Sequence, residues 1–297
     1  MTPFTPLNFA LPPHACDCHT HVYADPKRFP LAPERVYTPE VVEAEELTAF
    51  HARLGFERVV IVHPNTHGTD NSVTLYAMGV YGPNARGVAL VGDATSDAEI
   101  ESMTRAGMRG ARINLRMRPG DETDIAGGRT QFQALAERVH RYNWYVQMFT
   151  SQPVIAGIAD LVRDAPVPIV FDHFGGLDAA LGPDQPGFAV LLGLVRSGQA
   201  YVKISAAYRS SAQAPDYPDV APFARALIAA NSDRILWGSD WPHPTGVTPP
   251  GRRATEVTPM KRIDDGALLN QLAVWEPDPA IRHKILVDNP ARLYGFD

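Results

Sequence analysis

Short apolar runs alternate with longer segments of helical periodicity from one end of the chain to the other. The apolar runs are nearly continuous in Val, Ile, Phe and Leu, which is typical of strands covered on both faces. Eight runs of this kind predict strands at Ala15–His19, Arg58–Pro64, Gly87–Gly92, Gly110–Leu115, Tyr145–Phe149, Pro168–His173, Ala200–Ser205 and Ile235–Asp240.

The intervening segments carry apolar residues at helical spacing and predict helices. They are Glu43–Leu54, Asn71–Val80, Asp97–Ala106, Thr130–Asn143, Pro153–Arg163, Pro186–Arg196 and Ala221–Ala230, with Asp264–Trp275 and Pro279–Leu293 after the last strand. Eight strands alternating with helices over 297 residues predict an α/β fold, a single-domain (β/α)8 TIM barrel over residues 1–297. The active site of such a barrel lies at the carboxyl ends of the strands.

An open doubly wound sheet is the alternative architecture. It would be expected to carry a glycine-rich phosphate loop after a strand, and the chain has neither G-x-G-x-x-G nor G-x-x-x-x-G-K-[ST]. Three long loops follow predicted strands, at Tyr23–Thr38, Arg116–Gly128 and Trp241–Arg262. In a barrel these loops would form the rim on which active sites are built.

Charge and composition narrow the choice of partners. The chain has 33 acidic and 27 basic residues, a net charge of −6, and no basic block that would neutralise phosphates, so a nucleic-acid partner is not expected. No apolar run approaches the length of a membrane span, and the first residues do not resemble a signal peptide. With Cys16 and Cys18 as the only cysteines, a cytoplasmic protein is expected. The sequence leaves the oligomeric state open, a homo-oligomer included.

Candidate catalytic side chains stand where the predicted strands end. The first strand runs into Asp17-Cys18-His19-Thr20-His21. Residues i and i+2 of a strand point to the same side, so His19 and His21 should both face the barrel mouth. Two imidazoles there suit either a metal ion or hydrogen bonds to a developing oxyanion, although packed or surface histidines would give the same pattern.

Two further strand ends repeat this arrangement. The last strand runs into Trp237-Gly238-Ser239-Asp240-Trp241-Pro242-His243, where Asp240 could take a proton from water or could cap a turn. The sixth strand ends in Phe171-Asp172-His173-Phe174-Gly175 and offers a third imidazole. Histidine and aspartate side chains at the ends of three strands would all lie at one rim of the barrel. This arrangement favours a catalytic role for them over a role in core packing.

Together, D-x-H-x-H, D-H-x-G and W-G-S-D-W-P-H resemble the amidohydrolase superfamily, of the amidohydrolase-2 type. The similar branch contains 2-pyrone-4,6-dicarboxylate lactonase, 4-sulfomuconolactone hydrolase and D-galactarolactone isomerase. The resemblance extends over nearly the whole chain, to Gly107-Met108-Arg109-Gly110-Ala111-Arg112 and Asn289-Pro290-Ala291-Arg292-Leu293-Tyr294.

The resemblance implies roles for individual residues. Asp240 would activate water while His19, His21 and His173 hold the lactone carbonyl oxygen. Substrate-binding positions would be Tyr37, Asn65, Arg112, Arg118, Arg209 and Thr245, and arginine suits a carboxylate or sulfonate because its planar fork matches either group. Met148 would stand where the pyrone lactonase has a tyrosine, with the loss of one polar contact to substrate.

The resemblance also bears on the cofactor. Zinc-dependent members usually add a histidine on the fifth strand, and Tyr145–Phe149 has none. The pyrone lactonase works without a metal, and a lactone is an activated ester, so no cofactor is expected. The alternative is one divalent ion, zinc above all, on His19, His21 and Asp240.

These observations predict a hydrolase that opens a carboxylated or sulfonated lactone by water attack on the ring carbonyl. Such an enzyme would serve aromatic or sugar-acid catabolism with a small anionic lactone as its partner. The open alternatives are a sugar-acid lactone isomerase, a metal-dependent amidohydrolase or decarboxylase, and a non-enzymatic barrel that binds an anionic lactone.

Overall fold

Eight parallel strands form the centre of the molecule in the computed structural model, which describes residues 4–116 and 120–297. Each strand pairs with the next in chain order. They are β1 (Cys16–Thr20), β3 (Arg58–Val62), β4 (Ala85–Ala89), β5 (Met108–Asn114), β6 (Tyr145–Phe149), β7 (Ile169–Phe171), β8 (Ala200–Lys203) and β9 (Ile235–Leu236).

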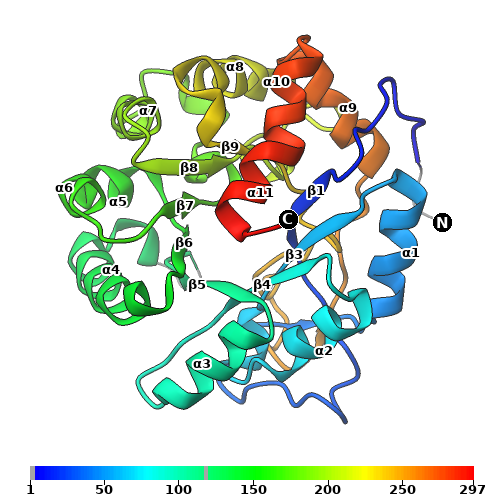
Figure 1. The fold of residues 1–297 in the computed structure, drawn as a ribbon, viewed down its shortest axis with the longest axis vertical. Coiled ribbons are helices and arrows are strands. Elements are labelled where there is room, and N and C mark those ends of the chain that lie inside the picture. Colours follow the sequence, from blue (N-terminus) through cyan, green and yellow to red (C-terminus); the bar gives the residue numbers. More distant parts are fainter. Residues whose placement is uncertain (1–3, 117–119) are drawn as a thin grey trace.

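Backbone contacts between β1 and the segment after β9 bring the two ends of the sheet together. A parallel bridge joins Thr20 to Trp241, and the Asp240 N–H group donates to the His19 carbonyl at 2.8 Å. The strands form a ring with the helices outside it (Figure 1). The predicted (β/α)8 barrel is therefore confirmed.

The helices follow the strands much as the periodicity predicts. They are α1 (Ala44–Leu54), α2 (Ser72–Tyr81), α3 (Asp97–Arg105), α4 (Ile125–Val139), α5 (Gln152–Gly157), α6 (Ala159–Arg163), α7 (Phe188–Arg196), α8 (Ala221–Ala230), α9 (Asp265–Trp275), α10 (Pro279–His283) and α11 (Asn289–Tyr294). Helix α3 shows how the sequence sets a boundary: the Ser96 hydroxyl accepts from the Glu99 N–H group, and the Glu99 carboxylate accepts from the Ser96 N–H group. This capping box fixes the start of α3.

Strand residues divide between two apolar layers because successive side chains point to opposite faces. One set, which includes Val59 and Ile61 of β3, packs against the surrounding helices. The other, which includes Val60 and Cys18, fills the lower barrel together with Tyr294 and Phe296. Near the C-terminus, carbonyls accept hydrogen bonds from Arg58, the first residue of β3, and Arg86, the second residue of β4. The C-terminal segment therefore covers the amino-terminal end of the barrel and leaves the carboxyl end for a site.

Several boundaries differ from the sequence prediction. The loop predicted at Arg116–Gly128 is shorter, because the Asp124 carboxylate accepts from the Gly127 N–H group and starts α4 at Ile125. The predicted helix Pro153–Arg163 is interrupted at Ile158, and Pro279–Leu293 contains a π-helical turn at Lys284–Asp288. No helix in the described ranges is long and apolar enough to cross a membrane.

Two rim loops also contain structure that the sequence did not indicate. Strands β2 (Thr38–Pro39) and β10 (Val257–Thr258) pair in parallel, so the loops predicted at Tyr23–Thr38 and Trp241–Arg262 are joined. Both loops contribute to the cavity described below. This small sheet therefore ties together two walls of the candidate site.

Candidate active site

A cavity of about 320 Å³ opens at the carboxyl ends of the strands. Its walls come from most of the strand ends and from the joined rim loops. The lining side chains include His19, His21, Tyr23, Tyr37, Asn65, Arg112, Arg116, Phe149, His173, Tyr208, Arg209, Asp240, Thr245 and Lys261. The predicted rim location is therefore where the structure places a polar cavity.

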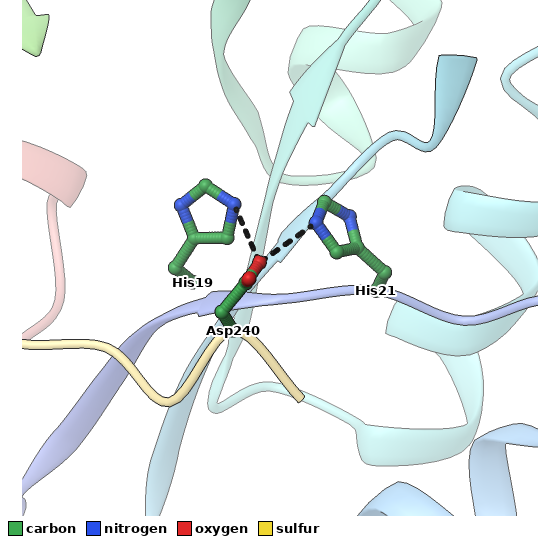
Figure 2. A group of neighbouring side chains, drawn as sticks. All are labelled: His19, His21 and Asp240. Carbon is green, nitrogen blue, oxygen red and sulfur yellow. Dashed lines mark ion pairs between the residues drawn. The ribbon is translucent and has the colours of Figure 1, made fainter. Parts of the chain in front are cut away.

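Three imidazoles surround one oxygen of Asp240. Its Oδ1 atom lies 3.4 Å from Nε2 of His21, 3.6 Å from Nε2 of His19 and 3.8 Å from Nε2 of His173. Figure 2 shows His19 and His21 on either side of the carboxylate. The three strand ends singled out in the sequence thus meet at a single atom.

The backbone at Asp240 is bent to make this contact. Asp240 has φ 64°, a left-handed conformation that costs a non-glycine residue on the order of 1–3 kcal/mol and is often found at active sites. The strand predicted to reach Asp240 stops at Leu236, four residues before this bend. Two residues earlier, a Cβ atom on Gly238 would lie 2.7 Å from Cβ of His19, so only glycine lets the two segments approach this closely.

The second carboxylate oxygen of Asp240 is held by two donors from the segment after β8. The Arg209 Nε–H group and the Tyr208 hydroxyl each donate to Oδ2 at 2.7 Å. Tyr208 also lies 3.2 Å from Nδ1 of His243, whose Nε2 lies 3.0 Å from Asp265. The carboxylate is therefore fixed from both sides, with Oδ1 facing the histidines.

Burial and neighbouring charges act in opposite directions on Asp240. Burial alone would raise its pKa, but the Arg209 guanidinium outweighs burial and holds the pKa well below the ordinary carboxyl value. Burial lowers the pKa of His19 to about 3 and that of His173 well below its ordinary value. The site therefore contains an ionised carboxylate beside neutral His19 and His173.

The outer nitrogens of the histidines are also anchored. Nδ1 of His21 donates to the Val62 carbonyl at 2.7 Å, because a carbonyl can only accept. Nδ1 of His173 lies 2.9 Å from the Ser205 hydroxyl. These contacts fix the orientation of both rings.

Beneath His19 lies a buried polar group that the sequence did not reveal. Asp172, Gln147 and Lys203 are fully buried, and Lys203 Nζ lies 3.2 Å from Nδ1 of His19 and 3.3 Å from Oδ1 of Asp172. Gln147 accepts from Lys203 at 2.7 Å and donates to Asp172 at 3.0 Å. A lysine at the end of a short strand gives no sequence signal for burial, since its partners come from other strands.

Most of the predicted binding residues line the cavity. Tyr37, Asn65, Arg112, Arg209 and Thr245 all do so, whereas Arg118 lies outside the described residues. The prediction for Met148 was wrong. Because side chains alternate along β6, Met148 packs in the apolar layer under the helices, while Phe149 lines the cavity and Gln147 reaches Asp172.

Sequence reasoning missed several lining residues. It did not single out Arg116, Tyr208 or Lys261 as binding residues. Arg116 stands two residues after the end of β5, so its position near a strand end was an available signal. Lys261 had none, because its place in the wall depends on how the last rim loop folds back on the barrel.

The ligand atoms of His19, His21 and Asp240 lie within 4.8 Å of one another and could hold a metal ion. Nε2 of His19 and Oδ1 of Asp240 are buried and have no hydrogen-bond partner within residues 4–116 and 120–297, which is the condition expected of ligand atoms. His21 donates its outer N–H group to a carbonyl, as metal-ligating histidines usually do. The donor set therefore fits a divalent ion.

Comparison with known proteins gives the family. The Amidohydrolase family model matches residues 16–296, and the chain belongs to this family. Its 4-sulfomuconolactone hydrolase relative from Rhizobium radiobacter is 39% identical, with 98% of this chain and 93% of the relative covered. A 2-pyrone-4,6-dicarboxylate hydrolase from Comamonas testosteroni is 36% identical, with 96% and 92% covered.

Two further comparisons agree with this placement. A D-galactarolactone isomerase from Agrobacterium fabrum is 32% identical, with 98% of this chain and 94% of the relative covered. A crystal structure of an Agrobacterium tumefaciens protein in its apo form is 30% identical, has a TM-score of 0.80, and covers 98% and 99% of the two chains. The resemblance inferred from the strand-end motifs is confirmed.

Proposed function

We propose that this protein is a lactonase that opens the ring of a carboxylated or sulfonated lactone by attack of water on the ring carbonyl. One observation carries the proposal: the Oδ1 atom of Asp240 meets three imidazoles in a cavity that arginines also line. A general base beside hydrogen-bond donors is the arrangement that acyl transfer to water requires.

Asp240 is the base in this mechanism. Its Oδ2 atom is occupied by Arg209 and Tyr208, so Oδ1 is the oxygen available to a water molecule in the cavity. Water donates a proton to Oδ1 as its oxygen forms a bond to the carbonyl carbon. The ester C–O bond then breaks, and the leaving oxygen takes the proton, which yields a hydroxy acid or its keto tautomer.

In this mechanism His19 and His173 supply N–H groups to the carbonyl oxygen as it gains negative charge, and His21 lies beside Asp240 at the same point of the cavity. They are anchored from outside the cavity, as the contacts of His21 with Val62 and of His173 with Ser205 show. Donors fixed before the reaction need no reorganisation in the transition state, which is the main source of their effect.

Positive side chains on the other walls would bind the acidic groups of the substrate. Arg112 lies near the end of β5, Arg116 follows that strand, and Lys261 approaches from the last rim loop. Burial raises the pKa of Tyr37 to about 12, so its hydroxyl remains protonated; it lies 3.0 Å from the hydroxyl of Tyr23. Guanidinium groups bind carboxylate and sulfonate with similar geometry, which is why both classes are proposed.

If a divalent ion binds, His19, His21 and Asp240 would hold it, and it would lower the pKa of bound water and polarise the carbonyl. The proposal is a reaction that proceeds without it. The expected cytoplasmic location remains a prediction, and the oligomeric state remains open.

The test is an acid-release assay on 2-pyrone-4,6-dicarboxylate, 4-sulfomuconolactone and D-galactarolactone, with NMR identification of the products. Hydrolysis of an anionic lactone, reduced at least about 100-fold in Asp240→Asn, supports the proposal, because general-base catalysis contributes ~10²–10⁴-fold. A ring-isomerised product without acid release identifies an isomerase. Calorimetric binding without turnover identifies a binding protein, and either result overturns the proposal.

A further inference from the structure

The hydrogen-bond partners of His19 determine which of its ring nitrogens carries the proton. Nδ1 lies 3.2 Å from two groups of opposite character, Nζ of Lys203 and Oδ1 of Asp172. A lysine ammonium only donates, whereas a carboxylate only accepts. If Nδ1 accepts from Lys203, the proton of neutral His19 lies on Nε2; if Nδ1 donates to Asp172, Nε2 carries a lone pair.

The surrounding geometry favours the first arrangement. Lys203 Nζ lies 3.2 Å from Nδ1 and can donate to it, and Oδ1 of Asp172 faces the same ammonium group at 3.3 Å. The acceptors around Nζ are Gln147 Oε1, Asp172 Oδ1 and His19 Nδ1, which together match the three hydrogens of an ammonium group.

The inner side of the ring gives the same result. Nε2 of His19 lies 3.6 Å from Oδ1 of Asp240, and neither atom has a hydrogen-bond partner among the described residues. A hydrogen on Nε2 would point toward that oxygen and into the cavity, where a substrate oxygen can receive it.

His21 is fixed in the opposite form. Its Nδ1 donates to the Val62 carbonyl at 2.7 Å, so a neutral His21 carries a lone pair on Nε2. The two histidines of the H-x-H motif therefore present different groups to the cavity. His19 presents a donor and His21 an acceptor, although they stand two residues apart on the same face.

We infer that Lys203 is a positioning residue that holds His19 with its proton on Nε2 and so commits the H-x-H pair to hydrogen bonding rather than to metal binding. This inference rests on the proposed lactonase mechanism, in which it assigns a separate role to each histidine of the pair. The two hydrogens of the attacking water are received by Asp240 Oδ1 and His21 Nε2, while His19 donates to the carbonyl oxygen. An ammonium group beside His19 also repels a divalent cation.

Selective ¹⁵N-histidine labelling tests the inference in the wild-type, chelator-treated protein. Ring ¹⁵N shifts and two-bond ¹H–¹⁵N couplings distinguish a protonated ring nitrogen from one with a lone pair, and comparison with His19→Asn assigns the signals. We expect His19 protonated at Nε2 and His21 at Nδ1. Protonation of His19 at Nδ1, or at both nitrogens, overturns the inference.

Lys203→Met supplies the second measurement. Without the ammonium, His19 should carry its proton on Nδ1 and donate it to Asp172. Asp172 would then be an outer-shell partner of a ligating histidine, and such a partner typically changes metal affinity about 10- to 100-fold. Zinc affinity measured by titration should therefore rise by about that factor. Lys284→Met removes a lysine from an exposed ion pair with Asp233 and should leave both readouts unchanged. Unchanged tautomer and affinity in folded Lys203→Met overturn the inference; if that variant does not fold, the wild-type spectrum decides.

The two proposals fail separately. A protein that hydrolyses no lactone but shows the expected tautomers refutes the proposed function and leaves the role of Lys203 standing. A protein that hydrolyses lactones with His19 protonated at Nδ1 refutes only the role of Lys203.

Discussion

Arg209 donates its Nε–H group to Oδ2 of Asp240 at 2.7 Å, while the histidine Nε2 atoms approach Oδ1. A second donor group of Arg209, Nη2, is bound to the Pro244 carbonyl at 2.7 Å. The family resemblance implies a substrate-binding role for this arginine. Its contacts show that it also fixes the base, so its replacement should affect the chemical step.

Arg209→Met is therefore expected to lower kcat, whereas Arg112→Met should mainly raise KM. Arg112 lines the cavity, and its guanidinium is 4.0 Å from Asp172 and makes no contact with Asp240 among the described ion pairs. Loss of a charge-assisted contact to substrate costs on the order of 1.5–3 kcal/mol, or roughly 10- to 150-fold in KM. Steady-state kinetics on the best lactone measure the split, with a singly esterified substrate as control. A pure KM effect in Arg209→Met would show that its contact with Asp240 is unimportant.

The pH dependence of kcat/KM should be flat between about pH 5 and 9 for a lactone that does not titrate in that range. Asp240 has a lowered pKa, so its carboxylate is present above the ordinary carboxyl range and is lost only as the pH falls below that range. Burial raises the pKa values of Tyr37 and Tyr208, so both phenols stay protonated as the pH rises. A pH series of initial rates tests this, and an acid limb near pH 6 that disappears in Asp240→Asn would contradict it.

Exhaustive chelation should leave kcat/KM unchanged if hydrolysis needs no ion. Elemental analysis before and after treatment provides the control, and added zinc should not increase the rate. A requirement for zinc would instead show one ion per chain and activity that returns only when the metal is restored. That outcome would overturn the metal-independent mechanism while leaving the substrate class intact.

Gly238→Ala should destabilise the fold and disturb the base. The new Cβ atom would lie 2.7 Å from Cβ and 2.8 Å from the backbone nitrogen of His19, and overpacking of this kind typically costs ~1–3 kcal/mol. Gly79→Ala is the matched control, because Gly79 lies in α2, where an added methyl group would have nothing within 4 Å, and the variant should gain up to about 1 kcal/mol. Thermal melts of both variants measure the difference. Equal stability would show that the backbone at Gly238 shifts without cost.

The sequence determined the architecture and the reactive strand ends. Nearly continuous apolar runs such as that in Arg58–Val62, with helices between them, indicate parallel strands covered on both faces. The carboxyl ends of parallel strands then meet at one rim. For that reason His19, His21, His173 and Asp240 could be placed in one site from the order of residues alone.

Only the tertiary structure decided what surrounds those groups. Lys203 is buried because Asp172 and Gln147, from two other strands, supply its acceptors, and no local pattern records that pairing. Lys261 reaches the cavity wall through the fold of a rim loop. Which of Met148 and Phe149 lines the cavity depends on which face of β6 each side chain occupies. Short-range periodicity fixes which residues form strands, whereas hydrogen-bond partners far apart in the sequence fix protonation, tautomer and charge.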